Sequence, residues 1–213
     1  MKTLRFESRD EWFSARMGKV TGTRLKDIVV KRGTGEKAGF YEIIAERLKK
    51  PGYVPDIVGE HPMIRGQRLE EKAMEAFIAK TGKMVDSSLL MWVSDDNERI
   101  ALSPDGVIGD TEAVEIKCLA SGKHVEAFLT QQIPDEYHFQ ALQYFIVNPK
   151  LETLYFCFYD PSMVVHEFFY IEMHRSDVIA EVEEYRAYQV QKLEMIDSAV
   201  KRMLDSGNMV CAE

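Results

Sequence analysis

The chain has 213 residues, of which 46% are hydrophobic and 29% charged, and its formal net charge at pH 7 is −8. A chain of this size and composition is predicted to form one globular domain that buries a sizeable core. The negative charge argues against a uniformly basic nucleic-acid-binding surface. It still allows a local basic groove, because Lys and Arg are concentrated between residues 16 and 50.

The first half of the chain is predicted to be helical. Its helices are expected at about residues 8–17, 23–30, 40–49 and 62–81. Ser8 and Glu11 form a capping-box pattern at the start of the first helix, and Pro62 and Gly82 bound the last one. The sequence KRGTGEKAG after the second helix predicts a loop, and it lacks the Gly-Lys-Ser/Thr ending of a P-loop.

The second half is predicted to combine strands with helices. Strands are expected at about residues 89–93, 99–102, 106–108, 113–119, 151–160 and 164–173, with helices at 121–129, 134–147 and 176–205. This order predicts an α/β fold with a central mixed sheet flanked by helices and a long C-terminal helix. No linker divides the chain, so residues 1–213 are expected to form a single domain with its core at about 10–172.

Membrane and disulfide-rich classes are not expected. No apolar stretch approaches the roughly 20 residues of a transmembrane helix, and the opening residues MKTLRFESRDEW lack the apolar core of a secretory signal. The three cysteines, Cys118, Cys157 and Cys211, are too scattered for a disulfide framework or a four-cysteine cluster. We therefore expect free thiols in a reducing cytoplasm and no membrane partner.

The strand expected at residues 113–119 carries two charges on one face. Because alternate residues of a strand share a face, Val114 and Ile116 lie on an apolar face, while Glu115 and Lys117 lie together on the opposite one. Taken alone, this pattern is typical of a solvated sheet face. It indicates chemistry only if other acidic groups reach the same place.

Two further carboxylates are expected beside this pair. Asp105 lies ten positions before Glu115 on the far side of a tight turn, so a hairpin brings the two together across the ladder. Glu70 lies on the apolar stripe of the long helix, and an inward carboxylate is costly unless it is paired or bound to a metal. The alternatives are a structural ion pair with Lys117 or Arg16, and a hard-cation site. Oxygen-only ligands suit Mg²⁺ or Mn²⁺.

The same hairpin resembles a known catalytic signature. Pro104-Asp105 followed by Glu115-Ile116-Lys117 is similar to the PD-(D/E)XK nuclease motif. More narrowly, three other segments resemble motifs of the phage lambda exonuclease or YqaJ-like viral recombinase family: WFSARMGKVTGT, RGQRLE and FQALQY. They follow the family's order and cover roughly residues 10–170. The resemblance implies a restriction-endonuclease-like core.

The resemblance also implies roles for the residues of a metal site. Asp105 and Glu115 would hold catalytic Mg²⁺, or Mn²⁺ as a substitute, with the main-chain oxygen of Ile116 as a further ligand. Glu70 would be the upstream acidic residue of the metal site. Lys117 would orient the attacking water or stabilise the charged transition state. Divalent ions can activate water and stabilise the leaving oxygen, so such a set is sufficient for phosphodiester hydrolysis.

A pocket for the 5′-terminal phosphate of DNA is implied as well, formed by Arg16, Thr23, Ser103 and Gln140, with Gln143 as a secondary contact. Arginine can bind phosphate through two hydrogen bonds, and Thr23 is expected at a helix N-terminus, where anions are favoured. The family has serine at the position of Thr23. Each residue has an ordinary alternative: a surface arginine, a helix cap, a turn serine, and the polar side of a half-buried helix.

The activity that the resemblance implies is that of a Mg²⁺-dependent exodeoxyribonuclease. It would degrade one strand of linear double-stranded DNA from a 5′ end, release mononucleotides and leave a 3′ single-stranded overhang for phage-type recombination. A single-strand annealing protein is the implied partner and a homotrimeric ring the implied assembly. The implied location is the cytoplasm of a bacterial host of a phage or prophage. Two alternatives remain: a PD-(D/E)XK endonuclease, and a non-catalytic DNA-binding recombination module.

Overall fold

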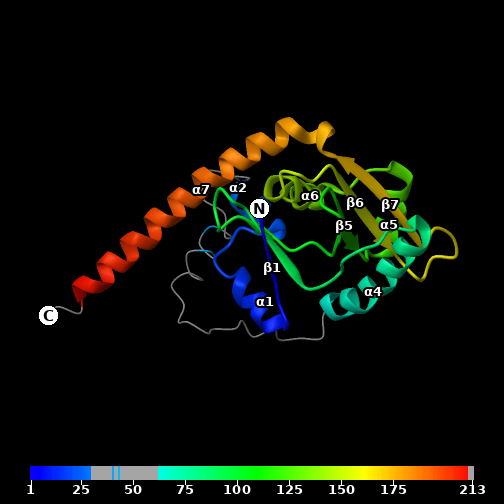
Figure 1. Ribbon diagram of the computed structural model, residues 1–213, viewed down its shortest axis with the longest axis horizontal. Helices are drawn as coiled ribbons and strands as arrows, with labels where there is room; N and C mark the ends of the chain where they lie inside the picture. The colour runs from blue at the N-terminus through cyan, green and yellow to red at the C-terminus, as the bar shows by residue number, and fades with distance from the viewer. Residues whose placement is uncertain (30–39, 41–42, 44–61, 211–213) are drawn as a thin grey trace.

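The computed structural model describes residues 1–29, 40, 43 and 62–210, and in these residues two β-sheets are surrounded by helices (Figure 1). The strands are β1 (Lys2–Arg5), β2 (Leu90–Val93), β3 (Ala101–Leu102), β4 (Gly106–Ile108), β5 (Glu112–Lys117), β6 (Thr153–Tyr159) and β7 (Phe168–His174). The helices are α1 (Arg9–Arg16), α2 (Leu25–Val29), α4 (Pro62–Thr81), α5 (Ser121–Thr130), α6 (Asp135–Val147) and α7 (Arg175–Val210). The predicted loop at 31–39 and most of the helix expected at 40–49 lie outside the described residues.

The larger sheet, with the order β4-β5-β6-β7, is mixed. Strand β5 is antiparallel to β4 and parallel to β6, and β7 is antiparallel to β6. The smaller sheet, β1-β2-β3, is antiparallel throughout. Main-chain pairing of Asp86 with Val107 links the segment before β2 to β4. The predicted α/β class with a mixed sheet is confirmed, but the strands expected at 89–93 and 99–102 belong to a second sheet.

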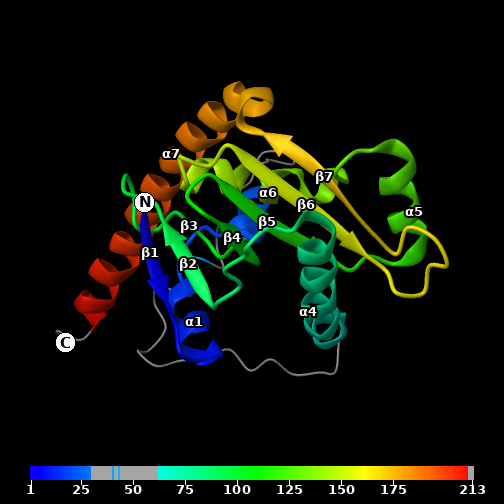
Figure 2. The ribbon, with the colours of Figure 1, turned by 45° about the vertical axis from the view of Figure 1, so that its right-hand side comes forward.

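Helices α4 and α6 pack on opposite faces of the larger sheet (Figure 2). Phe77 of α4 packs with Val114 and Ile116 on one face of β5. Leu142 of α6 lies in the other core cluster with Ala113, whose side chain points to the opposite face. Alternation along β5 therefore decides which residues face α4 and which face α6.

Helix α7 lies against α2 and α6, where Val182, Leu193 and Ile196 are buried. Near its C-terminal end Met203 and Leu204 are each 54% exposed, and this part of the helix projects from the body (Figure 1). Within the described part of the chain, no helix is both long and apolar enough to cross a membrane.

Some boundaries differ from the prediction for local reasons. Nothing in the sequence indicates β1, because all of its residues are exposed and show no apolar alternation. The strand expected at 99–102 is shorter, since Ile100 donates its main-chain N–H to the Asn97 carbonyl in a turn. The strand expected from residue 164 begins at Phe168, because Val164 lies fully exposed in the preceding turn.

Candidate active site

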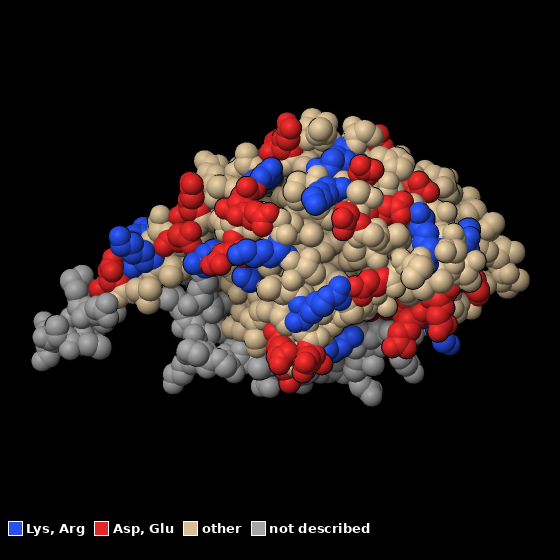
Figure 3. Space-filling view, in the orientation of Figure 1, with Lys and Arg blue, Asp and Glu red and all other residues tan. Residues whose placement is uncertain are grey.

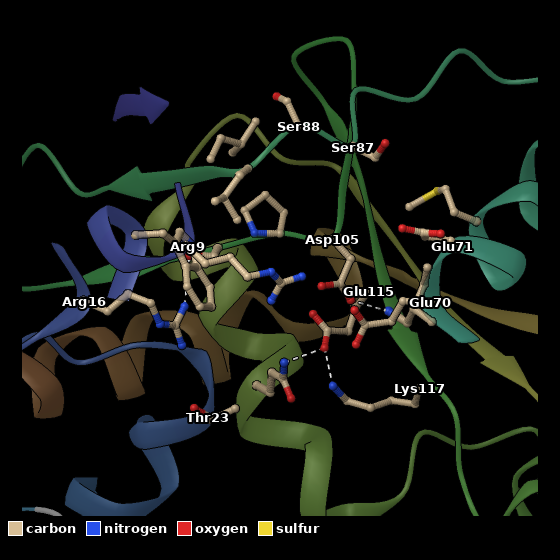
Figure 4. A pocket seen from close by; sticks show the side chains of 18 of the residues that line it. Arg9, Arg16, Thr23, Glu70, Glu71, Ser87, Ser88, Asp105, Glu115 and Lys117 are labelled. Carbon is tan, nitrogen blue, oxygen red and sulfur yellow. Dashed lines mark hydrogen bonds and ion pairs between the residues drawn. The ribbon is translucent and has the colours of Figure 1, made fainter. Parts of the chain in front are cut away.

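A cavity of about 660 Å³ lies between α1, the middle of α4, the β3–β4 segment, β5 and α6 (Figure 4). It is lined by nine of the predicted site residues: Arg16, Thr23, Glu70, Ser103, Asp105, Glu115, Ile116, Lys117 and Gln140. The fold therefore brings together side chains that are far apart in the sequence, as the predicted site requires.

Asp105 and Glu115 lie opposite each other in the β4–β5 hairpin. The register pairs Gly106 with Val114, which places Asp105 across from Glu115. The Oδ2 atom of Asp105 accepts a hydrogen bond of 2.7 Å from the main-chain N–H of Ile116. Burial and the charge of Glu115 raise the pKa of Asp105 well above its ordinary value. This carboxyl group is therefore held in a place where a nearby cation would stabilise its ionised form.

Glu115 is buried and receives three side-chain hydrogen bonds. Its Oε1 atom accepts from Lys117 Nζ, in an ion pair, and from Gln140 Nε2 at 2.5 Å. Its Oε2 atom accepts from the Tyr144 hydroxyl at 2.5 Å. Burial and the charge of Glu115 raise the pKa of Tyr144 well above its ordinary value, so this hydroxyl stays protonated and remains a donor. Both carboxylate oxygens are thus fixed in direction.

Lys117 stands between the acidic centre and an aromatic ring. Its Nζ atom lies 5.2 Å from the centroid of the Tyr137 ring, a distance at which a cation is attracted to the ring face. Burial acts to lower the pKa of Lys117, but the charges of Glu115 and Asp105 outweigh it and raise the pKa above the ordinary value. The ammonium group therefore stays charged at neutral pH.

Glu70 projects from α4 into the same cavity, and Figure 4 shows its side chain beside those of Asp105 and Glu115. Burial raises the pKa of Glu70, the charge of Lys117 acts against this, and Glu115 raises the pKa further. Three carboxylates thus influence one another here. The prediction that Glu70 points inward agrees with this placement.

The donor chemistry fits a divalent cation. Asp105, Glu115 and Glu70 offer oxygen atoms alone, which Mg²⁺ and Mn²⁺ prefer, and Ile116 lines the same cavity. As they stand, no three or more His, Cys, Asp or Glu side chains of the described residues are arranged to hold a metal ion. Glu115 is paired with Lys117 instead. A hard cation would therefore have to compete with Lys117 for Glu115, and it would offset the mutual repulsion of the carboxylates.

Arg16 and Ser103 form a second, cationic part of the cavity. The Nη1 atom of Arg16 donates to Ser103 Oγ at 2.9 Å, and Trp12 Nε1 donates to the same oxygen at 2.9 Å. The guanidinium carbon lies 4.3 Å from the centroid of the Trp12 ring. Burial and the charge of Arg24 lower the pKa of Arg16 to about 10. The group is still cationic at neutral pH, and Trp12 and Ser103 fix its plane.

The other two predicted phosphate contacts, Thr23 and Gln140, both line the cavity but have different surroundings. Thr23 is exposed at the cavity, in a 3-10 turn that precedes α2, and the N-cap position of that turn is occupied by Thr21. Gln140 lines the cavity but donates to Glu115, so it bridges the two halves of the site. Thr23 is thus no helix cap, and its contact with a phosphate stays a prediction.

The secondary assignment of Gln143 is not supported by its position and is corrected. Its side chain is fully buried away from the cavity lining. Its amide exchanges hydrogen bonds with Gln189 of α7 at 3.1 and 3.2 Å, and its Nε2 atom donates to the Val20 carbonyl at 3.3 Å. We therefore assign Gln143 to the packing between α6 and α7.

The family model of the YqaJ-like viral recombinase domain matches residues 11–150. The chain belongs to this family. Its fold is similar to that of an alkaline exonuclease, LHK-Exo, from Laribacter hongkongensis, with a TM-score of 0.79, 27% identity, and 94% of this chain and 98% of that chain covered. A structure of LHK-Exo in complex with dAMP has a TM-score of 0.74 and 28% identity, covering 92% of this chain and 98% of that one.

A phage-related exonuclease from Haemophilus somnus 129PT shares the fold at 14% identity, with a TM-score of 0.57 over 87% of this chain and 96% of its own. Comparison with curated proteins gave no match. The predicted family and fold are confirmed by these similarities.

Sequence reasoning missed two residues of this YqaJ-like site. Tyr144, whose hydroxyl donates to Glu115, follows Gln140 by four residues and so shares a helix face with a predicted site residue. Trp12 precedes Arg16 by the same spacing on α1. Its ring lies against the Arg16 guanidinium group, and its indole N–H donates to Ser103 Oγ, the same oxygen to which Arg16 donates. In each pair, the four-residue helical spacing was the signal that could have identified the partner.

Proposed function

We propose that this YqaJ-like protein is a metal-dependent exodeoxyribonuclease that hydrolyses one strand of linear double-stranded DNA from its 5′ end. Family membership and similarity to alkaline exonucleases support a nuclease of the lambda exonuclease type. The observation that carries the finer proposal is that one cavity is lined by both an acidic centre and the Arg16–Ser103 pair. A terminal phosphate at that pair would set the adjacent phosphodiester beside the carboxylates.

The chain's own groups divide the chemical work. Asp105, Glu115 and Glu70 would hold Mg²⁺ or Mn²⁺, which when bound supplies water activation and stabilisation of the leaving oxygen. Tyr144 keeps the Glu115 carboxylate in a single orientation. The Lys117 ammonium orients the attacking water or stabilises the charge that develops on the phosphoryl oxygens, which suits its compact charge.

The Arg16–Ser103 pair would detect the end of the strand. A guanidinium group binds phosphate through two parallel N–H···O bonds, and this one is already oriented by the Trp12 ring. Thr23 and Gln140 are near enough to line the same cavity and would complete the contact. Because acidic and basic side chains are interspersed over the face in Figure 3, we expect DNA recognition to depend on local features of this kind.

The finer biology is proposed from family membership. A viral recombinase domain with exonuclease activity would leave a 3′ overhang, which a single-strand annealing protein would then bind. A homotrimeric ring around DNA would keep the enzyme on its substrate. Release of 5′-mononucleotides is supported by the presence of dAMP in a structure of the relative LHK-Exo.

The decisive experiment is digestion of linear duplex DNA labelled at one 5′ or one 3′ end. We expect mononucleotide release from the 5′ end with Mg²⁺, none with EDTA, and faster digestion of 5′-phosphorylated than of 5′-hydroxyl ends. In Arg16→Gln protein the preference for the phosphate should disappear, whereas Arg202→Gln protein, altered on the exposed end of α7, should retain it.

Two results would favour the alternatives. Cleavage of covalently closed circular duplex at the same rate as linear duplex would indicate an endonuclease. Protein that binds duplex ends but leaves them intact in Mg²⁺ and in Mn²⁺ would indicate a non-catalytic recombination module.

A further inference from the structure

Three cationic side chains line the cavity, and two of them are committed to protein partners. Arg16 donates to Ser103 and lies on the Trp12 ring. Lys117 is paired with Glu115. Arg9 lines the cavity as well, yet no side chain of the described residues forms a hydrogen bond or ion pair with its guanidinium group.

The position of Arg9 in its helix is electrostatically unfavourable, which suggests a role in binding a ligand. Arg9 is the first residue of α1, directly after the N-cap Ser8, whose side chain accepts from Glu11 N at 3.2 Å. A cation in the first turn opposes the helix dipole, whereas Asp10 and Glu11 complement it. Folding of α1 therefore gives no reason for an arginine at this position.

The side chain is also aimed at the middle of the site. Figure 4 shows the Arg9 guanidinium reaching into the cavity between Arg16 and the side chains of Asp105 and Glu115. Its positive charge acts to lower the pKa of Glu70. The cavity is lined by four carboxylates and, besides Arg9, by the two cations Arg16 and Lys117. An approaching DNA backbone therefore meets an excess of negative charge, which the charge of Arg9 reduces.

We propose that Arg9 binds the first phosphodiester of the hydrolysed strand, the one beside the acidic centre, on the side that faces the terminal phosphate at Arg16. This inference rests on the proposed function, because it places the strand along the line from Arg16 to Asp105. Arg9 then contributes affinity for DNA without contributing to discrimination of the 5′ end.

The test is equilibrium binding of a linear 5′-phosphorylated duplex in EDTA, where no hydrolysis occurs, over a range of NaCl concentrations. In Arg9→Gln protein we expect the affinity to fall about tenfold at low salt, as for loss of one charge-assisted contact. The slope of log affinity against log salt should become shallower by about 0.7 to 0.9, the value for one phosphate contact. Arg9→Lys should keep the slope, and Arg202→Gln should match the wild type.

A second measurement separates Arg9 from the end-binding pocket. The affinity ratio between 5′-phosphorylated and 5′-hydroxyl duplexes should be unchanged in Arg9→Gln protein and should approach one in Arg16→Gln protein. Unchanged affinity and salt slope in Arg9→Gln protein would overturn the inference, as would loss of the end preference. Wild-type protein that binds the duplex but does not cut it with Mg²⁺ would refute the proposed function alone, since the Arg9 comparison needs no cleavage.

Discussion

Removing the hydroxyl of Tyr144 tests whether the site is positioned by its buried hydrogen bonds. The hydroxyl has one proton and two acceptors in reach, Glu115 Oε2 at 2.5 Å and the Val114 carbonyl at 3.3 Å. The hydroxyl proton is expected to bind Glu115 rather than the Val114 carbonyl, because Glu115 is nearer and its carboxylate is charged. Tyr144 is fully buried, so Tyr144→Phe changes little in packing and leaves one oxygen of a buried carboxylate without this donor.

The expected cost follows from the charged partner. A hydrogen bond to a charged group contributes about 1.5–3 kcal/mol to stability, and the complete burial of Tyr144 argues against weakening by solvent. For a chain of this size each kcal/mol lowers the melting temperature by about 2–4 °C. We therefore expect Tyr144→Phe to melt about 3–12 °C below the wild type in EDTA.

The same substitution should affect hydrolysis. Loss of a group that orients a metal-binding carboxylate typically lowers metal affinity or activity about 10- to 100-fold. Thermal melts with and without Mg²⁺, and the Mg²⁺ dependence of duplex digestion, measure the two effects. Tyr185→Phe is the matched control, because the ring of Tyr185 packs against Phe139 and its hydroxyl has no hydrogen bond within the described residues.

A double-mutant cycle isolates the interaction. In a Glu115→Gln background the effect of Tyr144→Phe on stability should shrink to that of a neutral hydrogen bond, about 0.5–1.5 kcal/mol. Equal destabilisation in both backgrounds, or a melting temperature and digestion rate like those of the wild type, would refute a positioning role for this hydroxyl.

Three other substitutions test separate parts of the structure. Burial and the charge of Glu115 raise the pKa of Asp105 in the folded state, so the stability that Asp105 contributes is lost as pH rises through that pKa. Asp105→Asn should therefore melt higher than the wild type in EDTA at pH 7, while losing hydrolysis. A lower melting temperature would contradict this. Lys117→Ala should keep duplex binding but lose hydrolysis by about 10²-fold or more, measured by binding and digestion in parallel, and loss of both would indicate a structural role. A hydrogen bond from Arg5 lowers the pKa of Asp86 to about 2, so the stabilisation is present above about pH 4 and lost between about pH 4 and 2. Acid titrations of Asp86→Asn should therefore show a smaller loss of stability in that window, and an unchanged titration would exclude this pair as the cause.

Local periodicity predicted the acidic centre. Alternation placed Glu115 and Lys117 on one face of β5, the turn spacing placed Asp105 across the hairpin, and the helical stripe turned Glu70 inward. Each of these inferences uses contacts within one element or one hairpin. Their geometry depends on the sequence of that segment alone, which is why a single sequence was sufficient.

Contacts between distant segments could not be predicted in the same way. Gln140 and Gln143 lie on neighbouring positions of the same helix face, and periodicity cannot tell which of them meets α7 and which meets the cavity. The structure decides this through Gln189, which pairs with Gln143. The second sheet was not predicted for the same reason, because β1 (Lys2–Arg5) pairs with β2 (Leu90–Val93), which is far from it in the sequence.

Strand β5 explains how an acidic site with repelling charges is held still. Its Ile116 side chain packs under α4 with Phe77, its Ile116 main-chain N–H binds Asp105, and its Glu115 side chain points to α6. Any shift of Asp105 relative to Glu115 would therefore have to disturb the packing of β5 against both helices. A core packed at crystal-like density resists such a shift. The rigidity that the proposed metal-dependent chemistry would require is thus supplied by apolar residues on the far face of the strand that carries the charges.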